Sequence, residues 1–177
     1  MNSLTHPSLA DQLNRSSLGI IDTSNAIVPQ LLAPRLNSNT KIGVIKELVD
    51  LLCQAGYVHD GLLFLQSVLA RENLQSTIID QRIAMPHARS QAVSHLGMAL
   101  GLAPEALDFP SGDERGQINV VCLVAAPVHT PGLHLDLMGF LANRFATPGL
   151  VDTMLQAATH MDIYQLLEPT SNQAHLV

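Results

Sequence analysis

The chain has 177 residues, which leaves room for one ordinary domain, because domains commonly span roughly 100–200 residues. Apolar residues make up 47% of the chain and charged residues only 14%, so it has enough material for a buried core and is not a disordered protein. A net charge of −6, with four Phe, two Tyr and no Trp, argues against nucleic-acid binding through phosphates and stacked bases.

Membrane spans and cysteine-based sites are also excluded by simple patterns. The longest apolar run, Val120 to Val128, is far shorter than the roughly 20 residues that cross a bilayer, and Met1–Leu13 lacks a basic segment followed by an apolar one. We therefore expect a soluble cytoplasmic protein without direct membrane insertion. Cys53 and Cys122 are too far apart for a zinc-binding pair and lie in apolar stretches, so both are expected to be buried thiols.

The chain divides into three expected parts. Residues 1–29 are rich in Ser, Asn, Thr and Leu without a sustained period, which indicates an N-terminal tail or accessory segment. Residues 30–168 are expected to form the domain, and 169–177 a C-terminal tail.

Two helices are predicted at the start of the domain. Over Thr40–Ala55 the apolar residues recur at i, i+3, i+4 and i+7, with Thr40 as the cap and Gly56 as the stop. Asp60 is expected to cap the second helix, which continues to Glu72. Its inward stripe is expected to consist of four residues: Leu62, Leu65, Val68 and Leu69.

Extended segments follow. Asn73–Arg82 is expected to be a loop before the apolar piece Ile83–Met85. Pro86 disfavours helical geometry at the residue before it, so His87 is expected at the end of a strand or on a loop.

Two longer strands are predicted next. Large residues alternate with small ones over Leu96–Leu102, which is the period of a strand. After a turn at Pro110–Gly116, the Val-rich run Ile118–Ala126 is almost wholly apolar, as in a strand that is buried on both faces at the centre of a sheet.

Helices are predicted again in the last third. Thr130–Pro131 starts one whose stripe is expected to be Leu133, Leu137, Phe140 and Leu141. Thr147–Pro148 starts the next, and Asp162 caps a last one that ends before Pro169. Helices before and after buried strands predict an α/β fold, a three-layer α/β/α sandwich with a mixed central sheet covered by helices on both faces.

The histidines are the first candidates for chemistry, since the chain has eight of them. His6, His59 and His175 are expected to be solvated, and His95 and His160 have no distinctive setting. His129 and His134 are five positions apart, which is not the i, i+4 spacing of a helical metal-binding pair, so no metal is expected. The sequence also lacks a G-x-S-x-G, P-loop or dinucleotide motif, and no cofactor is expected.

Three arginines surround His87 in the sequence. Arg71, Arg82 and Arg89 fall within nineteen residues that contain only two acidic residues. Guanidinium groups suit phosphate, and a neutral imidazole can attack a phosphoryl group, so His87 with Arg71, Arg89 and His134 can form a phosphoryl-transfer site. The alternative from spacing alone is three unrelated surface arginines, a structural His87 and a half-buried His134.

Three motifs in order resemble one family. Arg71-Glu-Asn-Leu-Gln-Ser-Thr77 and Ile83-Ala-Met-Pro-His-Ala-Arg89 are similar to the active-site signature of the fructose/mannitol-type enzyme IIA domain of the bacterial phosphoenolpyruvate-dependent sugar phosphotransferase system, which also has a nitrogen-regulatory branch. Leu48–Leu52 resembles the family's first helix, and His134-Leu, with Leu137 and Leu141, resembles its second histidine helix.

The resemblance implies a phosphoryl carrier. It implies that His87 accepts a phosphoryl group from the phosphocarrier HPr and passes it to a cysteine of a IIB partner, while His134 and Arg71 contact the phosphoryl oxygens. Arg89 and Arg82 are the further candidates for binding phosphate.

One departure keeps an alternative open. The family usually has a glycine-rich turn where this chain has Ile78–Arg82, so Arg82 either adds a phosphate contact or obstructs HPr. The alternative is a regulatory, nitrogen-type binding protein whose partner is a target protein, in which phosphorylation is only a signal or has been lost. A zinc-dependent hydrolase is the third hypothesis.

Overall fold

The computed structural model describes residues 25–168 of the chain. The expected C-terminal tail, most of the expected N-terminal segment, and His6 and His175 lie outside the described residues. Within the expected N-terminal segment, Ala26 and Ile27 are buried, and the amide of Met98 donates to the carbonyl of Ala26 at 3.0 Å. The packed part of the chain therefore includes these two residues.

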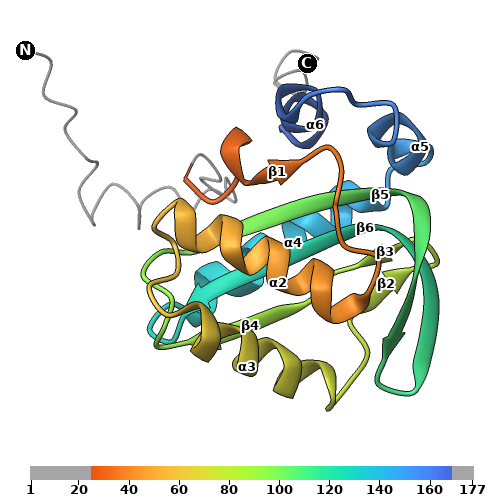
Figure 1. Cartoon of the computed structure of the whole chain (residues 1–177). Helices are drawn as coiled ribbons and strands as arrows, with labels where there is room; N and C mark the ends of the chain where they lie inside the picture. Colours follow the sequence, from red (N-terminus) through yellow and green to blue (C-terminus); the bar gives the residue numbers. More distant parts are fainter. Residues whose placement is uncertain (1–24, 169–177) are drawn as a thin grey trace, which may run out of the picture.

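A mixed sheet of six strands forms the middle layer (Figure 1). The strand order is β1-β5-β6-β3-β2, and β4 also pairs with β6. β5 and β6 are antiparallel, whereas β1 is parallel to β5, and β3 and β4 are parallel to β6. The strand bounds are β1 Leu32–Ala33, β2 Ile78–Asp80, β3 Ile83–Ala84, β4 His87–Ser90, β5 Gly97–Ser111 and β6 Glu114–Pro127.

Helices cover both faces of this sheet, which confirms the three-layer α/β/α prediction. In Figure 1, α2 and α3 lie in front of the sheet and α4 lies behind it. None of the helices in residues 25–168 is long and apolar enough to cross a membrane. The helix bounds are η1 Pro29–Leu31 (a 3₁₀ turn), α2 Lys41–Gln54, α3 Gly61–Glu72, α4 Pro131–Phe145, α5 Leu150–Met154 and α6 His160–Leu167.

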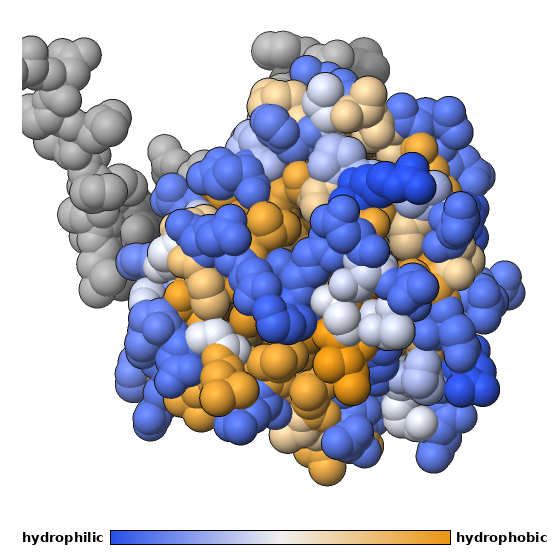
Figure 2. Space-filling model, viewed as in Figure 1, coloured by the Kyte–Doolittle hydropathy of each residue, from blue (hydrophilic) through white to orange (hydrophobic). Residues whose placement is uncertain are grey.

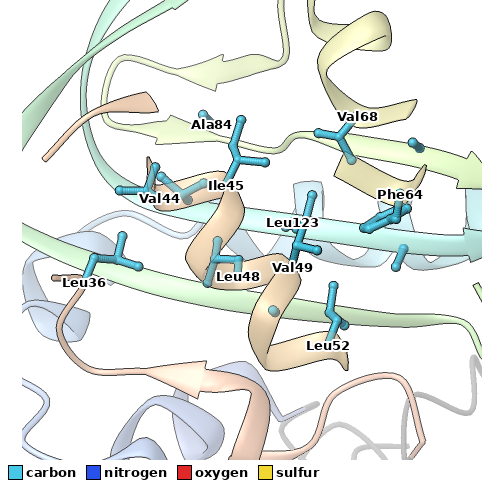
Figure 3. Close-up of a cluster of buried hydrophobic side chains, with 14 of the residues drawn as sticks. Leu36, Val44, Ile45, Leu48, Val49, Leu52, Phe64, Val68, Ala84 and Leu123 are labelled. Carbon is cyan, nitrogen blue, oxygen red and sulfur yellow. The ribbon is translucent and has the colours of Figure 1, made fainter. Parts of the chain in front are cut away.

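Strand alternation divides the interior into two cores. Along β6, Val121 and Leu123 face α2 and α3, whereas Val120, Cys122 and Val124 face α4. Every residue from Ile118 to Ala126 is buried, so the central strand was correctly predicted. Figure 3 shows the first core, in which side chains of α2 and α3 meet Leu123.

The first two helices begin as predicted. The Thr40 hydroxyl accepts a hydrogen bond from the Gly43 amide at 3.2 Å, and the Asp60 carboxylate accepts one from the Leu63 amide at 3.0 Å. The predicted inward stripe of α3 is wrong in part, because Leu62 is 68% exposed while Phe64 is fully buried. α3 is leucine-rich all round, so its packing against β4, rather than its period, selects the buried face.

The unburied face of α3 leaves apolar side chains at the surface. Leu62 and Leu63 of α3 are exposed, and so is Leu74, two residues after the end of the helix. Figure 2 shows apolar residues gathered in the lower part of the view, where Figure 1 draws α3.

The helices of the last third differ from the prediction at their starts. The first residue of α5 is Leu150, with Gly149 at φ +76 as its N-cap, so the start at Thr147–Pro148 was wrong. Asp162 is not the cap of α6: Thr159 is, and Asp162 completes the capping box three residues later. In both helices, the predicted N-cap lies within three residues of the observed N-cap.

Two loops are more ordered than predicted. The expected loop 73–82 contains β2, which is antiparallel to β3, and the expected turn 110–116 narrows to Gly112–Asp113 between long strands. Positive φ occurs in the described residues only at glycines, so the segment Ile78–Arg82 turns without needing one. Cys122 is buried as expected, whereas Cys53 is only partly buried.

Candidate functional site

His87 is the first residue of β4, which continues the line of β3 after a break at Met85 and Pro86. β3 and β4 keep one register against β6, since Ile83 pairs with Val120 and His87 with Val124. Met85 and Pro86 separate the two pieces, and the Pro86 carbonyl still accepts a bond from the Val124 amide at 2.9 Å. Because paired residues share a face, His87 lies on the α4 side of the sheet together with Val124.

The site lies where the two helical layers approach the same sheet edge. β4 pairs only with β6, so its other side is an edge (Figure 1). α3 packs against β4 from the opposite face, through residues such as Val68 and Ala88. Residues of α3 and of α4 can therefore both approach His87 around this edge.

A backbone carbonyl fixes the proton on the His87 ring. Nδ1 of His87 lies 3.0 Å from the carbonyl oxygen of Met85. A carbonyl can only accept, so Nδ1 carries the hydrogen and Nε2 keeps a free lone pair. Burial lowers the pKa of His87, and the charge of Arg71 lowers it further, while the bond to Met85 acts in the opposite direction. The imidazole is therefore neutral at pH 7 and able to act as a nucleophile.

His134 faces His87 from the first turn of α4. The two ring centroids are 5.7 Å apart, with the ring planes inclined at 49°. His134 is only 9% exposed, and its Nε2 is buried without a hydrogen-bond partner. Burial lowers the pKa of His134, and the charges of His87 and Arg89 add to this effect. A buried polar atom without a hydrogen-bond partner lowers the stability of the fold, so a ligand that hydrogen-bonds to Nε2 of His134 would bind favourably there.

The sequence placed Leu133 on the buried stripe of α4, which is wrong. Leu133 is 45% exposed, and His134 takes the buried position beside Leu137 and Leu141. The orientation of α4 about its own axis therefore buries His134 against the sheet and leaves Leu133 at the surface.

Two of the three candidate arginines lie near the histidine pair. Arg71 is in the last turn of α3, donates to the Gln75 carbonyl at 3.1 Å, and its charge acts on His87. Arg89 is exposed two positions after His87, on the same face of β4, and its charge acts on His134. Both supply positive charge where a phosphate would have to be stabilised.

Arg82 lies elsewhere. Its Nε donates to Asn119 at 2.8 Å and its Nη1 pairs with Asp152 on α5 at 2.7 Å. Arg82 is five positions before His87 on an extended chain, and these five steps span about 16 Å along the strand direction. The structure therefore does not bring Arg82 to the histidine pair.

The remaining histidines of the described residues are exposed: His59, His95, His129 and His160. Within residues 25–168, no three His, Cys, Asp or Glu side chains are grouped so as to hold a metal ion.

Sequence reasoning missed two contributors to the site. The Met85 carbonyl orients His87, and a backbone acceptor leaves no residue-type signal. Glu72 was expected to end a helix and was given no role of its own in the site, yet it is 1% exposed. The signal that could have pointed to it is its place in the motif Arg71-Glu-Asn-Leu-Gln-Ser-Thr77, between the arginine and the Ser-Thr pair.

Comparison with known proteins points to one family. Residues 27–169 match the family model described as "Phosphoenolpyruvate-dependent sugar phosphotransferase system, EIIA 2". The mannitol-specific phosphotransferase enzyme IIA component of Staphylococcus aureus (strain MRSA252) is 30% identical over 136 residues, covering 75% of this chain and 88% of that protein. The fructose-specific EIIABC component of Bacillus subtilis (strain 168) is 29% identical over 132 residues, covering 75% of this chain but only 21% of that longer protein.

Solved structures share the fold. Nitrogen regulatory protein IIA-Ntr from Neisseria meningitidis superposes with a TM-score of 0.71 at 20% identity, covering 86% of this chain and 99% of that one. Enzyme IIA mannitol from Escherichia coli, in its complex with phosphorylated enzyme IIB mannitol, superposes with a TM-score of 0.65 at 21% identity, covering 80% and 96%. At 20–21% sequence identity, this structural similarity establishes that the chain shares the α/β fold of these proteins, and it does not establish a shared function.

Proposed function

The chain belongs to the EIIA 2 family of the phosphoenolpyruvate-dependent sugar phosphotransferase system, whose members are phosphoryl-transfer components, and from this premise we propose that Nε2 of His87 carries the phosphoryl group. The observation that carries the proposal is the histidine pair: a neutral imidazole with its proton fixed on Nδ1 faces a second, buried imidazole whose Nε2 has no partner. The carrier is proposed to work in the cytoplasm, between an HPr-type donor and a IIB acceptor.

The proposed reaction has two balanced steps. The Nε2 lone pair of His87 attacks the phosphorus of the donor's phosphohistidine, so that a new N–P bond forms while the donor's N–P bond breaks and its nitrogen recovers the electron pair. In the second step a IIB thiolate attacks the same phosphorus, which forms an S–P bond and returns His87 to the neutral state. No net proton is needed on His87 at any point, because Nδ1–H stays on the Met85 carbonyl.

The neighbouring groups have separate roles in this scheme. In its Nε2–H form His134 donates to a phosphoryl oxygen and thereby satisfies its unpartnered nitrogen. Arg71 from α3 and Arg89 from β4 place positive charge on two sides of the developing dianion. The exposed Leu133 and Leu135 flank His134 on α4 and offer apolar surface to a docking protein.

Labelling tests the proposal directly. Purified protein is incubated with phosphoenolpyruvate, enzyme I and HPr, and its mass is measured under neutral and acidic conditions. We expect the wild type to gain one acid-labile phosphoryl group, and His87→Ala to gain none. His129→Ala, which changes an exposed histidine outside the pair, is the matched control and should be labelled like the wild type. An unlabelled wild type, or equal labelling of His87→Ala, contradicts the proposal.

A further inference from the structure

A buried carboxylate lies at the centre of a polar network beneath the site. Glu72, the last residue of α3, is 1% exposed. Its Oε1 accepts a hydrogen bond from the Thr77 hydroxyl, and its Oε2 accepts one from the Ser111 hydroxyl at 2.7 Å and lies 2.7 Å from Nζ of Lys41. Lys41 comes from the first turn of α2 and Ser111 from the end of β5. Three separate elements thus converge on one side chain.

Thr77 connects this network to the reactive histidine. Its amide donates to the Ser111 hydroxyl at 2.9 Å, and its carbonyl accepts from the Met85 amide at 2.8 Å. The Met85 carbonyl in turn accepts from Nδ1 of His87 at 3.0 Å. A continuous path of hydrogen bonds therefore runs from Glu72 through Thr77 and Met85 to the imidazole.

Every polar group of Thr77 is engaged on this path. Its amide, hydroxyl and carbonyl each have at least one partner, and the residue is 3% exposed, so the network allows it a single position. Met85 is engaged on both sides of its Cα: its amide donates to Thr77, and its carbonyl accepts from His87. A shift of Thr77 must therefore move the Met85 carbonyl, and with it the acceptor that holds the proton on Nδ1.

Stability alone is a weak reason for such a network. Removing a carboxylate and an ammonium from water is costly, and buried ion pairs can often be replaced by apolar residues without loss of stability. The best-attested effect of a fully satisfied buried network is to define one conformation. Here the conformation it defines includes Arg71, directly before Glu72, and the strand break that presents His87.

We propose that Glu72 and Thr77 are positioning residues for phosphoryl transfer: through Met85 they hold His87 in the Nδ1–H form with Nε2 free for attack. The effect on transfer rests on the proposed function of His87. The effect on the ring's tautomer does not, because it can be measured in the unphosphorylated protein.

Thr77 offers a closely matched pair of variants. Thr77→Val keeps the size and shape of the side chain but removes the hydroxyl, whereas Thr77→Ser keeps the hydroxyl. Protein labelled with ¹⁵N in its histidine rings is examined by NMR at about pH 8, where both tautomers of a neutral imidazole have distinct nitrogen shifts. We expect wild type and Thr77→Ser to show His87 in the Nδ1–H form, and Thr77→Val to show a mixture of the two forms.

Kinetics then connect the tautomer to transfer. For phosphoryl acceptance from HPr, Thr77→Val should lower kcat by roughly ten- to a hundredfold, the size of effect that a small displacement of a reacting group produces, while KM for HPr stays near its wild-type value. Thr77→Ser should restore kcat to within a few-fold of wild type. Because partial unfolding would also lower the apparent kcat at unchanged KM, the rates are expressed per folded molecule, with the folded fraction taken from the NMR spectrum of the same sample.

A second variant guards against a failure to fold. Lys41→Met combined with Glu72→Gln removes both charges together and leaves neither unpaired, so the domain should keep its fold while the path to Thr77 is weakened. It should also show mixed tautomers of His87 and a lowered kcat. An unchanged Nδ1–H form in both Thr77→Val and this double variant overturns the positioning proposal. An unphosphorylated wild type with the expected tautomer changes overturns the proposed function alone.

Discussion

His87 and His134 have complementary chemistry although both are histidines. The Met85 carbonyl assigns the proton of His87 to Nδ1 and leaves Nε2 as a nucleophile. His134 offers the opposite function, since its buried Nε2 needs a partner and can donate to one. Burial lowers the pKa of both rings, so both are neutral at pH 7. A phosphoryl dianion placed beside them, as proposed, would raise the pKa of both.

Replacing His134 tests its role as a donor. His134→Ala removes the buried imidazole that lies beside His87, and we expect phosphoryl acceptance to slow by about 10²- to 10³-fold, as when an oxyanion donor is lost. His134→Gln, whose amide can donate, should recover part of the rate. Quenched-flow measurement of phosphorylated protein gives the rates. Equal rates for wild type and His134→Ala would rule out a donor role.

The arginines provide a matched comparison. Arg71 acts on His87 by its charge, whereas Arg82 is held by Asn119 and Asp152 about 16 Å along the strand. Arg71→Ala should therefore slow acceptance of the phosphoryl group by about tenfold or more, and Arg82→Ala by less than about twofold. The same quenched-flow assay measures both. A larger loss with Arg82→Ala than with Arg71→Ala would show that the arginine assignment is wrong.

At the scale of elements, the β5–β6 hairpin supports the loop that follows α3. Ser111, at the end of β5, accepts from the amide of Thr77, and Gly112 begins the tight turn into β6. Gly112 has φ +58, and a Cβ placed on it would lie 2.8 Å from the Ser76 nitrogen. The hairpin tip thus needs glycine both for its backbone angle and for its close approach to the loop.

Substituting this glycine should therefore be costly. We expect Gly112→Ala to lower the free energy of unfolding by about 1–3 kcal/mol, through left-handed strain and the clash with Ser76. Gly139→Ala is the control: it lies within α4 with open space around it, and should raise stability by about 0.5–1 kcal/mol. Urea titrations followed by circular dichroism measure both. Similar values for the two variants would contradict the proposed strain.

At the scale of the whole domain, one sheet holds two cores and exposes the site at its edge. The odd and even residues of β6 serve different helical layers, so neither layer can be removed without exposing half of the central strand. Such sharing predicts cooperative unfolding of the described domain. The histidine pair is therefore coupled to global stability and not only to the local site.

That coupling predicts a pH dependence of stability. Burial lowers the pKa of His87 and His134 below the 6.5 of a free histidine, so as pH falls below about 6.5 the unfolded chain takes up protons first and the free energy of unfolding decreases. The decrease between about pH 7.5 and about pH 5.5 should be smaller in the double variant His87→Ala/His134→Ala than in wild type. His129→Ala, with its exposed ring, should keep the wild-type decrease. A double variant with the full decrease would show that these two histidines do not carry it.

Periodicity and composition were sufficient to predict the layers of this protein, because the helices and strands that form the layers follow from local sequence patterns. Sequence patterns predicted three features that the structure confirms: the Val-rich central strand β6, the helix caps Thr40 and Asp60, and the break at Pro86. The sequence also predicted that His87 and His134 belong to one site, and in the structure their ring centroids lie 5.7 Å apart. Local signals of this kind survive folding, since a strand or helix imposes its own period on the chain.

Which face of each helix turned inward was decided only by tertiary packing. Phe64 rather than Leu62, and His134 rather than Leu133, became buried because α3 and α4 had to fit a particular sheet edge. The separation of Arg82 from Arg71 and the path from Glu72 to His87 have the same origin. Contacts between residues distant in sequence depend on how whole elements are placed, and no pattern within one element contains that information.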